Sequence, residues 1–184
     1  MQKVIDACAK EHPDSARDRA VLLLLARLGL RAGDVAAMCL NDIDWTRARF
    51  RVTGKGRHED WLPLPQDVGD AILAYLRDRR RVAGCDRVFL IARAPWGPLR
   101  GSSSVSAIVR RAMRRAGVSA GAGARGAHLL RHSAATEMLR EGLSLPSIGV
   151  VLRHRCVETT AHYAKVDVQM LHSVAQPWLG AESC

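Results

Sequence analysis

A histidine and an arginine in the last third of the chain have the spacing of an anion-binding site. His128 and Arg131 are three residues apart in a segment with a helical pattern, so both side chains lie on one helix face. Imidazole and guanidinium groups both donate hydrogen bonds to oxyanions such as phosphate. A glycine-rich stretch, residues 119–126, precedes them, and His132 follows at i+4 from His128. A structural histidine on a helix is the alternative interpretation.

Tyr163 is a candidate nucleophile. The chain has two tyrosines, and Tyr75 falls on the inward face of a predicted helix. The neighbours of Tyr163 are small or polar, so periodicity gives this side chain no place in the core. A tyrosine hydroxyl attacks when a base takes its proton or when nearby cations lower its pKa from about 10. An ordinary surface tyrosine is the alternative.

Lys55 is a candidate proton donor. The 28 basic residues comprise 24 arginines and four lysines, and Lys55 lies in a predicted turn, Gly54-Lys55-Gly56. Arginine keeps its proton at any accessible pH, whereas lysine can release one. Neighbouring cations lower the pKa of a lysine and so make this release easier.

Metal and disulfide chemistry have little support. Asp42 and Asp44 are two residues apart, but metal-dependent nuclease sites need more carboxylates than this, so we interpret both as exposed strand residues. The five cysteines show no C-x-x-C spacing, which argues against structural zinc and a disulfide framework. We therefore expect no metal and no cofactor, and a reducing cytoplasmic location. No apolar run is long enough to span a bilayer, and we see no secretory signal.

The elements that must position these residues are mostly helical. Leu22, Leu25 and Ala26 predict one buried face on an early helix, and the i, i+3, i+4 pattern is clearest from Val105 to Ala116. The predicted fold is mainly α with a small three-stranded antiparallel β-sheet. Helices are predicted over residues 16–28, 32–38, 67–82, 102–116, 128–141, 145–153 and 157–163, an amphipathic segment over 167–175, and strands over 43–45, 49–53 and 60–63.

The charge pattern favours a phosphate-rich partner. The net charge is +10, and residues 87–136 hold nine arginines and no acid. A solvated face usually mixes both signs, so this segment predicts a surface that binds double-stranded DNA. The predicted DNA contacts are Arg57, Arg110, Arg111, Arg114, Arg115 and Arg125.

Five short motifs, taken in order, resemble the catalytic domain of the tyrosine recombinase (phage integrase) family, and the resemblance covers about residues 16 to 175. They are Leu28-Gly-Leu-Arg31, Gly54-Lys55-Gly56, His128-x-x-Arg131-His132, Leu152-x-His154, and Tyr163 nine residues later. The resemblance implies a domain that cleaves and rejoins DNA strands through a covalent link to a tyrosine.

The resemblance also implies individual roles. Arg31 and Arg131 match the arginines that hold the non-bridging oxygens of the scissile phosphate, and His154 matches a second phosphate-binding histidine. A pair of guanidinium groups suits the charge that builds on those oxygens during attack.

Three further residues match groups that move protons or attack phosphorus. Lys55 matches the general acid for the 5′-oxygen, His128 the histidine that assists proton transfer, and Tyr163 the nucleophile that forms a 3′-phosphotyrosine. Because the covalent link conserves the bond energy, the reaction needs neither ATP nor metal.

The chain departs from the family pattern at one residue and in its domain organisation. Arg153 stands where the family usually has glycine, and we expect it to change the local backbone. The resemblance predicts a lead-in (1–15), a catalytic core (16–166) and a tail (167–184), with the family's N-terminal core-binding domain absent. The tail is expected to dock on a neighbouring copy in a synaptic tetramer.

Three alternatives use the same residues differently. A DNA-binding module of the same fold would bind without cleaving, and a type IB topoisomerase-like enzyme would cleave without exchanging partners. A helix-turn-helix regulator would leave Lys55 and Tyr163 unexplained.

Overall fold

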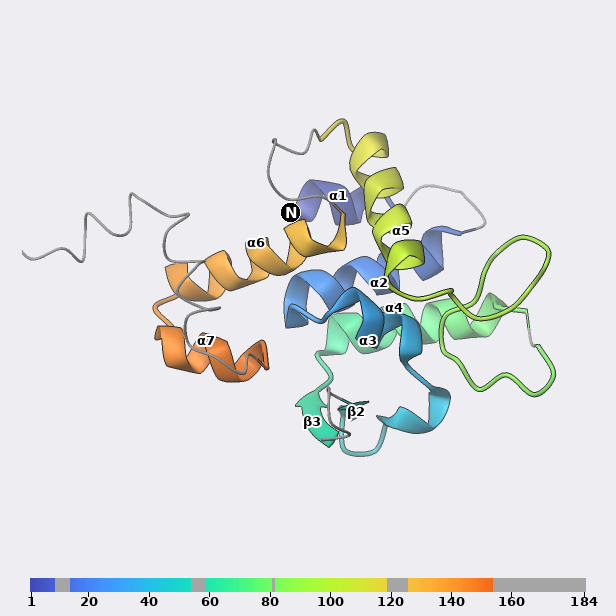
Figure 1. Cartoon of the computed structure of the whole chain (residues 1–184), viewed down its shortest axis with the longest axis horizontal. Coiled ribbons are helices and arrows are strands. Elements are labelled where there is room, and N and C mark those ends of the chain that lie inside the picture. The colour runs from blue at the N-terminus through green and yellow to red at the C-terminus, as the bar shows by residue number, and fades with distance from the viewer. Residues whose placement is uncertain (9–13, 54–58, 81, 119–125, 154–184) are drawn as a thin grey trace, which may run out of the picture. The chain divides into compact units, whose positions relative to one another are not determined.

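The computed structural model describes residues 1–8, 14–53, 59–80, 82–118 and 126–153. Two compact units, Met1–Ala134 and Ala135–Cys184, divide the chain within its sixth helix. The described part is mostly helical with one three-stranded sheet, which confirms the predicted fold class (Figure 1). The elements are α1 (Gln2–Asp6), α2 (Ser15–Leu28), α3 (Ala32–Ala37), the 3₁₀ turn η1 (Leu40–Asp42), β1 (Ile43–Asp44), β2 (Arg49–Thr53), β3 (Glu59–Pro63), α4 (Gln66–Asp78), α5 (Ser102–Arg115), α6 (Ala127–Arg140) and α7 (Leu145–Val151).

Helix α2 is the centre of the first unit. The predicted buried positions Leu22, Leu25 and Ala26 are confirmed, and Val21, Leu23 and Leu24 on the other faces are buried as well. Figure 1 shows α2 running between α5 and α4, and it packs against both. A helix that is apolar on every side is one that neighbours cover on every side.

The sheet is antiparallel in the order β1-β2-β3. Phe50 of β2 pairs with Ile43 on one side and Leu62 on the other, and Phe50 and Val52 alternate into the core. Strand β1 ends at Asp44, one residue earlier than predicted, because Trp45 already belongs to the turn before Arg49.

The buried positions of α5 agree with the prediction, whereas α4 ends earlier than predicted. The apolar positions of α5 from Val105 to Ala116 are buried, as predicted. Helix α4 ends at Asp78 rather than at residue 82. The Arg79 guanidinium donates to the carbonyl oxygens of Arg87 and Val88, at 2.6 and 3.1 Å. These tertiary contacts accompany the extended backbone of Arg79, which ends the helix.

The N-terminal lead-in contains a helix that the sequence analysis did not predict. Val4 and Ile5 of α1, with Cys8 after it, are buried in the core of the first unit. The second unit has its own small core of Ala135, Ile148 and Leu152. The predicted helix over 157–163, the segment over 167–175 and the boundary at residue 166 lie outside the described residues. Among the described helices, none has the length and apolar character needed to cross a membrane.

Candidate functional site

Arg31 lies at a sharp turn between two helices. Helix α2 ends at Gly29, whose φ of 57° lies in the left-handed region that glycine tolerates best. Leu30 is buried, and Arg31 is the exposed N-cap residue of α3. Its carbonyl oxygen accepts hydrogen bonds from the backbone N–H groups of Asp34 and Val35. The Leu-Gly-Leu-Arg sequence thus ends one helix, anchors the turn and presents an arginine at its outer side.

Arg131 meets this same turn from a helix a hundred residues away in the chain. Its side chain is 6% exposed, and its Nη1 donates a hydrogen bond to the carbonyl oxygen of Gly29. Gly29 is only two residues before Arg31. The structure therefore brings both predicted phosphate-binding arginines to one turn of the first unit.

His128 forms a close pair with His132, one helical turn further along α6. Their Nε2 atoms are 2.9 Å apart and share a hydrogen bond, and the rings are perpendicular with centroids 4.4 Å apart. His128 is exposed and His132 half-buried. The i, i+4 spacing was visible in the sequence, but a direct bond between the two rings was not predicted.

Only one of the two tyrosines lies within the described residues. Tyr75 is buried, stacks on Phe89 with centroids 5.6 Å apart, and accepts a hydrogen bond from the backbone N–H of Leu90. Burial raises the pKa of Tyr75. The prediction that Tyr75 faces the core is confirmed, and neither its burial nor its pKa suits a nucleophile.

Five predicted site residues lie outside the described residues, so their roles stay predictions. Strands β2 and β3 pair as far as Thr53 and Glu59, the residues on either side of one of these segments. The five are Lys55, Arg57, Arg125, His154 and Tyr163.

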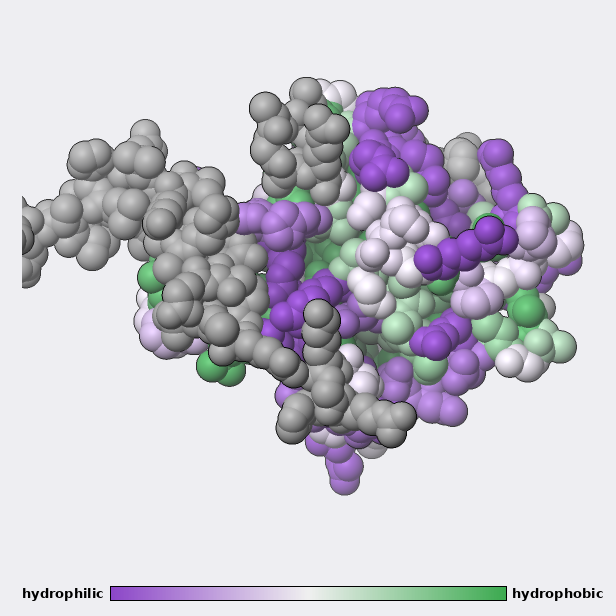
Figure 2. Space-filling view, in the orientation of Figure 1, coloured by the Kyte–Doolittle hydropathy of each residue, from purple (hydrophilic) through white to green (hydrophobic). Residues whose placement is uncertain are grey.

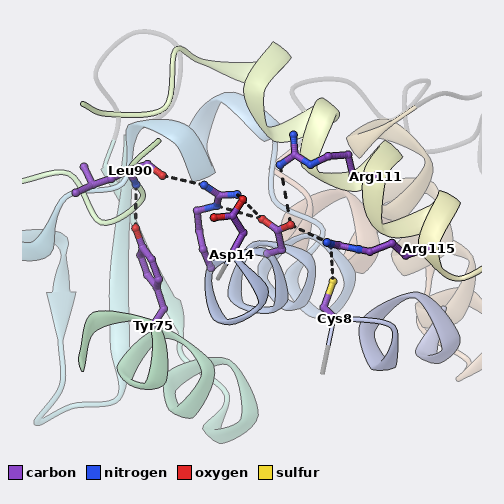
Figure 3. A network of polar contacts seen from close by, with 8 residues as sticks. Cys8, Asp14, Tyr75, Leu90, Arg111 and Arg115 are labelled. Carbon is purple, nitrogen blue, oxygen red and sulfur yellow. Dashed lines mark hydrogen bonds and ion pairs between the residues drawn. The ribbon is translucent and has the colours of Figure 1, made fainter. Parts of the chain in front are cut away.

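The arginines of α5 divide into two pairs. Asp18 of α2 is completely buried, and its Oδ2 lies 3.0 Å from Nη2 of Arg115 and 4.0 Å from Nη2 of Arg111 (Figure 3). Its Oδ1 accepts from Nε and Nη2 of Arg17, at 3.1 and 2.7 Å. Arg115 also contacts the Cys8 thiol at 3.5 Å, and burial raises the pKa of that thiol against the opposing effect of Arg115.

These contacts favour a structural role for Arg115, which was predicted to touch DNA. All four arginines are exposed, but Arg110 and Arg114 make none of these contacts to Asp18, and hydrophilic side chains gather over the C-terminal half of α5 in Figure 2. The sequence signal for the difference is Asp18, the acid next to the apolar run of α2.

Removing the Asp18 carboxylate should destabilise the protein strongly. In Asp18→Ala, the buried Arg17 guanidinium loses two hydrogen bonds to a full counter-charge. Breaking a buried ion pair on one side costs about 3–5 kcal/mol of unfolding free energy, measurable by urea denaturation. Asp67→Ala is the control, because its pair with Arg27 is exposed and is expected to be worth about 1 kcal/mol or less. Equal losses in the two variants would contradict the structural role of Asp18.

Asp42 and Asp44 each form an ion pair with an arginine. Asp42 Oδ1 accepts from Arg51, and Asp44 Oδ2 accepts from Arg49 at 3.1 Å. The backbone N–H of Arg47, and after it Arg49, lowers the pKa of Asp44. Both carboxylates thus pair with arginines of β2. The interpretation as exposed strand residues was wrong in part, because Asp42 lies in η1 rather than in a strand and both aspartates are half-buried.

Arg153 keeps the backbone conformation that glycine would favour. Its φ is 54°, and its N–H donates to the carbonyl oxygen of Val150 just after α7 ends. The effect of Arg153 on the local backbone relative to the family stays a prediction. A non-glycine residue in this region costs about 1–2 kcal/mol, and the buried neighbour Leu152 holds the turn in place.

Comparison with known proteins gives a consistent picture. The sequence model described as "Phage integrase family" matches residues 1–170. A protein of Sinorhizobium fredii named as an integrase/recombinase, y4rA, is 46% identical over 181 residues, covering 98% of this chain and 43% of that protein. Tyrosine recombinase XerC of Corynebacterium efficiens is 32% identical over 165 residues, covering 90% of this chain and 51% of that protein.

A solved structure shares the fold. The XerH site-specific recombinase bound to a palindromic difH substrate superposes with a TM-score of 0.78 at 20% identity, covering 97% of this chain and 51% of that one. The chain thus spans about half the length of these relatives.

Proposed function

Because this chain belongs to the phage integrase family, we propose that it is the catalytic domain of a site-specific DNA recombinase. Its substrate is double-stranded DNA, which it cleaves and rejoins through a covalent 3′-phosphotyrosine. The relatives carry the names integrase and tyrosine recombinase, and the XerH structure was solved on DNA. No membrane partner is involved, and the reaction takes place in the cytoplasm.

The main structural support for this proposal is a hydrogen bond made by Arg131. The Arg131 guanidinium, which comes from α6, bonds to the carbonyl oxygen of Gly29, two residues before Arg31. Guanidinium groups bind the non-bridging oxygens of a phosphodiester with paired hydrogen bonds. Two such groups at one place offset the charge that these oxygens gain when a nucleophile attacks phosphorus. His128, on the same helix as Arg131, adds a further donor.

The proposed chemical step conserves bonds and protons. The Tyr163 Oη atom attacks the phosphorus and forms a P–O bond, while the bond from phosphorus to the 5′-oxygen breaks. Lys55 gives its proton to that 5′-oxygen, and His128 assists in taking the proton of the tyrosine. His154 is assigned to the phosphate with the two arginines. Reversal with a different 5′-hydroxyl rejoins the strand, and no cofactor enters.

The assembly on DNA is also part of the proposal. The C-terminal residues 167–184 dock on a neighbouring copy, so that the active assembly is an oligomer on two DNA duplexes. The y4rA protein and XerC are each about twice as long as this chain. The added length in those proteins is consistent with a second half of a DNA clamp, which would raise affinity by a chelate effect.

The exposed arginines of α5 should dominate the salt dependence of DNA binding. Replacing Arg110 and Arg114 together by Gln is expected to weaken binding to any duplex. The slope of log K against log salt should become shallower by about 0.9 for each phosphate that the variant no longer neutralises. Arg115→Gln should act mainly on stability, because that side chain is paired with buried Asp18. Fluorescence anisotropy at several salt concentrations measures both, and an unchanged slope in the double variant would remove α5 from the DNA surface.

A nicked suicide substrate tests the proposed function as a whole. Wild-type protein is incubated with duplexes carrying a nick beside the cleavage site, so that the released fragment diffuses away and the covalent complex accumulates. We expect a denaturation-resistant protein–DNA band that keeps a label placed on the 5′ side of the break. Salt-dependent binding without any such band, on substrates covering the natural attachment sites, would favour the DNA-binding module. Relaxation of supercoiled DNA without strand exchange would favour the topoisomerase-like alternative.

A further inference from the structure

The histidine pair of α6 has the geometry of a metal chelate. His128 and His132 lie at i and i+4 on one helix, and their Nε2 atoms are 2.9 Å apart. Imidazole nitrogens bind divalent transition metals at about 2.0–2.1 Å. Two such ligands at right angles on one ion stand about 2.9 Å apart, whereas a tetrahedral angle requires about 3.3 Å. The pair therefore has the spacing of adjacent positions on a square-planar or tetragonal ion.

Solvent access and a rigid helix favour binding of an ion by the pair, whereas the positive charge of Arg131 on the same helix opposes it. His128 is exposed, so an ion has access from solvent. Both rings come from a regular helix, which holds their spacing without a cost in loop ordering. Among the residues that the structure describes, no group of three or more His, Cys, Asp and Glu side chains gathers as a metal cage. Within the described residues the pair supplies two ligands, and the proposal leaves the other coordination positions to water or small ligands.

We propose that His128 and His132 form a bidentate site for a divalent transition-metal ion of the Cu²⁺ or Ni²⁺ type. Square-planar and tetragonal coordination by nitrogen is the preference of these two ions, and Cu²⁺ binds nitrogen ligands more tightly than the other first-row divalent ions. On binding, the ring that donates the shared hydrogen bond moves its proton to Nδ1. Each ring then turns slightly so that its Nε2 lone pair points at the ion.

Occupation of this site has a consequence that rests on the proposed function. The ion takes the Nε2 lone pair of His128 and adds a positive charge beside the phosphate-binding turn. A coordinated His128 cannot assist the proton of the nucleophile. The metal therefore acts as an inhibitor of strand cleavage, and its removal restores the reaction.

The binding test uses the full chain without DNA. The probe is Cu²⁺ held by iminodiacetate, a tridentate chelator that leaves coordination positions for imidazole and protects the ion from cysteine thiols. Calorimetry should show one ion bound per chain. Electron paramagnetic resonance should show two imidazole nitrogens coordinated to the Cu²⁺ ion. In His128→Asn and His132→Asn, the loss of the chelate effect should weaken this site by roughly a hundredfold.

The control is His172→Asn, a histidine outside the pair, which should bind as wild type does. Wild-type affinity in either pair variant, with an unchanged melting temperature, would overturn the site. A loss of binding in the control of the same size would also overturn it.

A second arm separates this inference from the proposed function. The probe should stop wild-type cleavage of the suicide substrate, and EDTA should restore it. If the probe binds the pair but cleavage continues at the untreated rate, the metal site stands and the role of His128 in the reaction fails. If wild type never cleaves, the binding arm still decides the site.

Discussion

Tyr163→Phe is expected to abolish the covalent protein–DNA complex while leaving DNA affinity within about twofold. The change removes one oxygen atom, and without it no P–O bond to the protein can form. Phenylalanine keeps the ring and the charge, so the phosphate contacts that dominate affinity are untouched. Denaturing gel electrophoresis of the suicide-substrate reaction measures the adduct, and anisotropy measures binding.

The other tyrosine of the chain provides the matched control. Tyr75→Phe also removes one hydroxyl, but that hydroxyl accepts a backbone hydrogen bond in the core. The variant should still form the adduct and should lose about 1–3 kcal/mol of stability, because the N–H of Leu90 is left buried without its acceptor. An adduct in Tyr163→Phe at the wild-type level, or its loss in Tyr75→Phe at full folding, would refute the assignment of the nucleophile.

Arg131→Lys should lower the rate of cleavage by roughly 10²–10³-fold, the effect of removing one preorganised donor from a transition-state oxyanion. Arg131 already holds the Gly29 carbonyl oxygen with one arm of its guanidinium. A lysine ammonium has a single nitrogen, so it cannot keep this contact and also grip two phosphate oxygens in one plane. Single-turnover cleavage of the nicked substrate measures the rate.

Charge is preserved in this variant, so DNA affinity should change little. Arg77→Lys, an exposed position of α4, serves as the control for an arginine-to-lysine change and should cleave as wild type does. Thermal melting checks that Arg131→Lys is folded. Cleavage by folded Arg131→Lys at the rate of Arg77→Lys would show that Arg131 does not hold the reacting phosphate.

Local pattern in the sequence was sufficient for most of the secondary structure and for the fold class. The apolar positions of α5 predict their burial, which is found, and the predicted strand over residues 49–53 is β2. These features depend on the 3.6-residue and two-residue periods of the backbone, which need no knowledge of a distant partner. The order and spacing of the motifs likewise predicted the family, which the match over residues 1–170 confirms.

Tertiary structure alone decided which neighbour each polar side chain meets. Nothing near Arg115 in the sequence distinguishes it from Arg114, and both are exposed, yet Arg115 reaches buried Asp18 on α2 and Arg114 does not. Arg131 meets the turn of Gly29 only because α6 and α2 come together in the folded first unit. A helical period specifies a face but not the element that covers it. Long-range packing makes that choice, and it separates a structural arginine from one that is available to DNA.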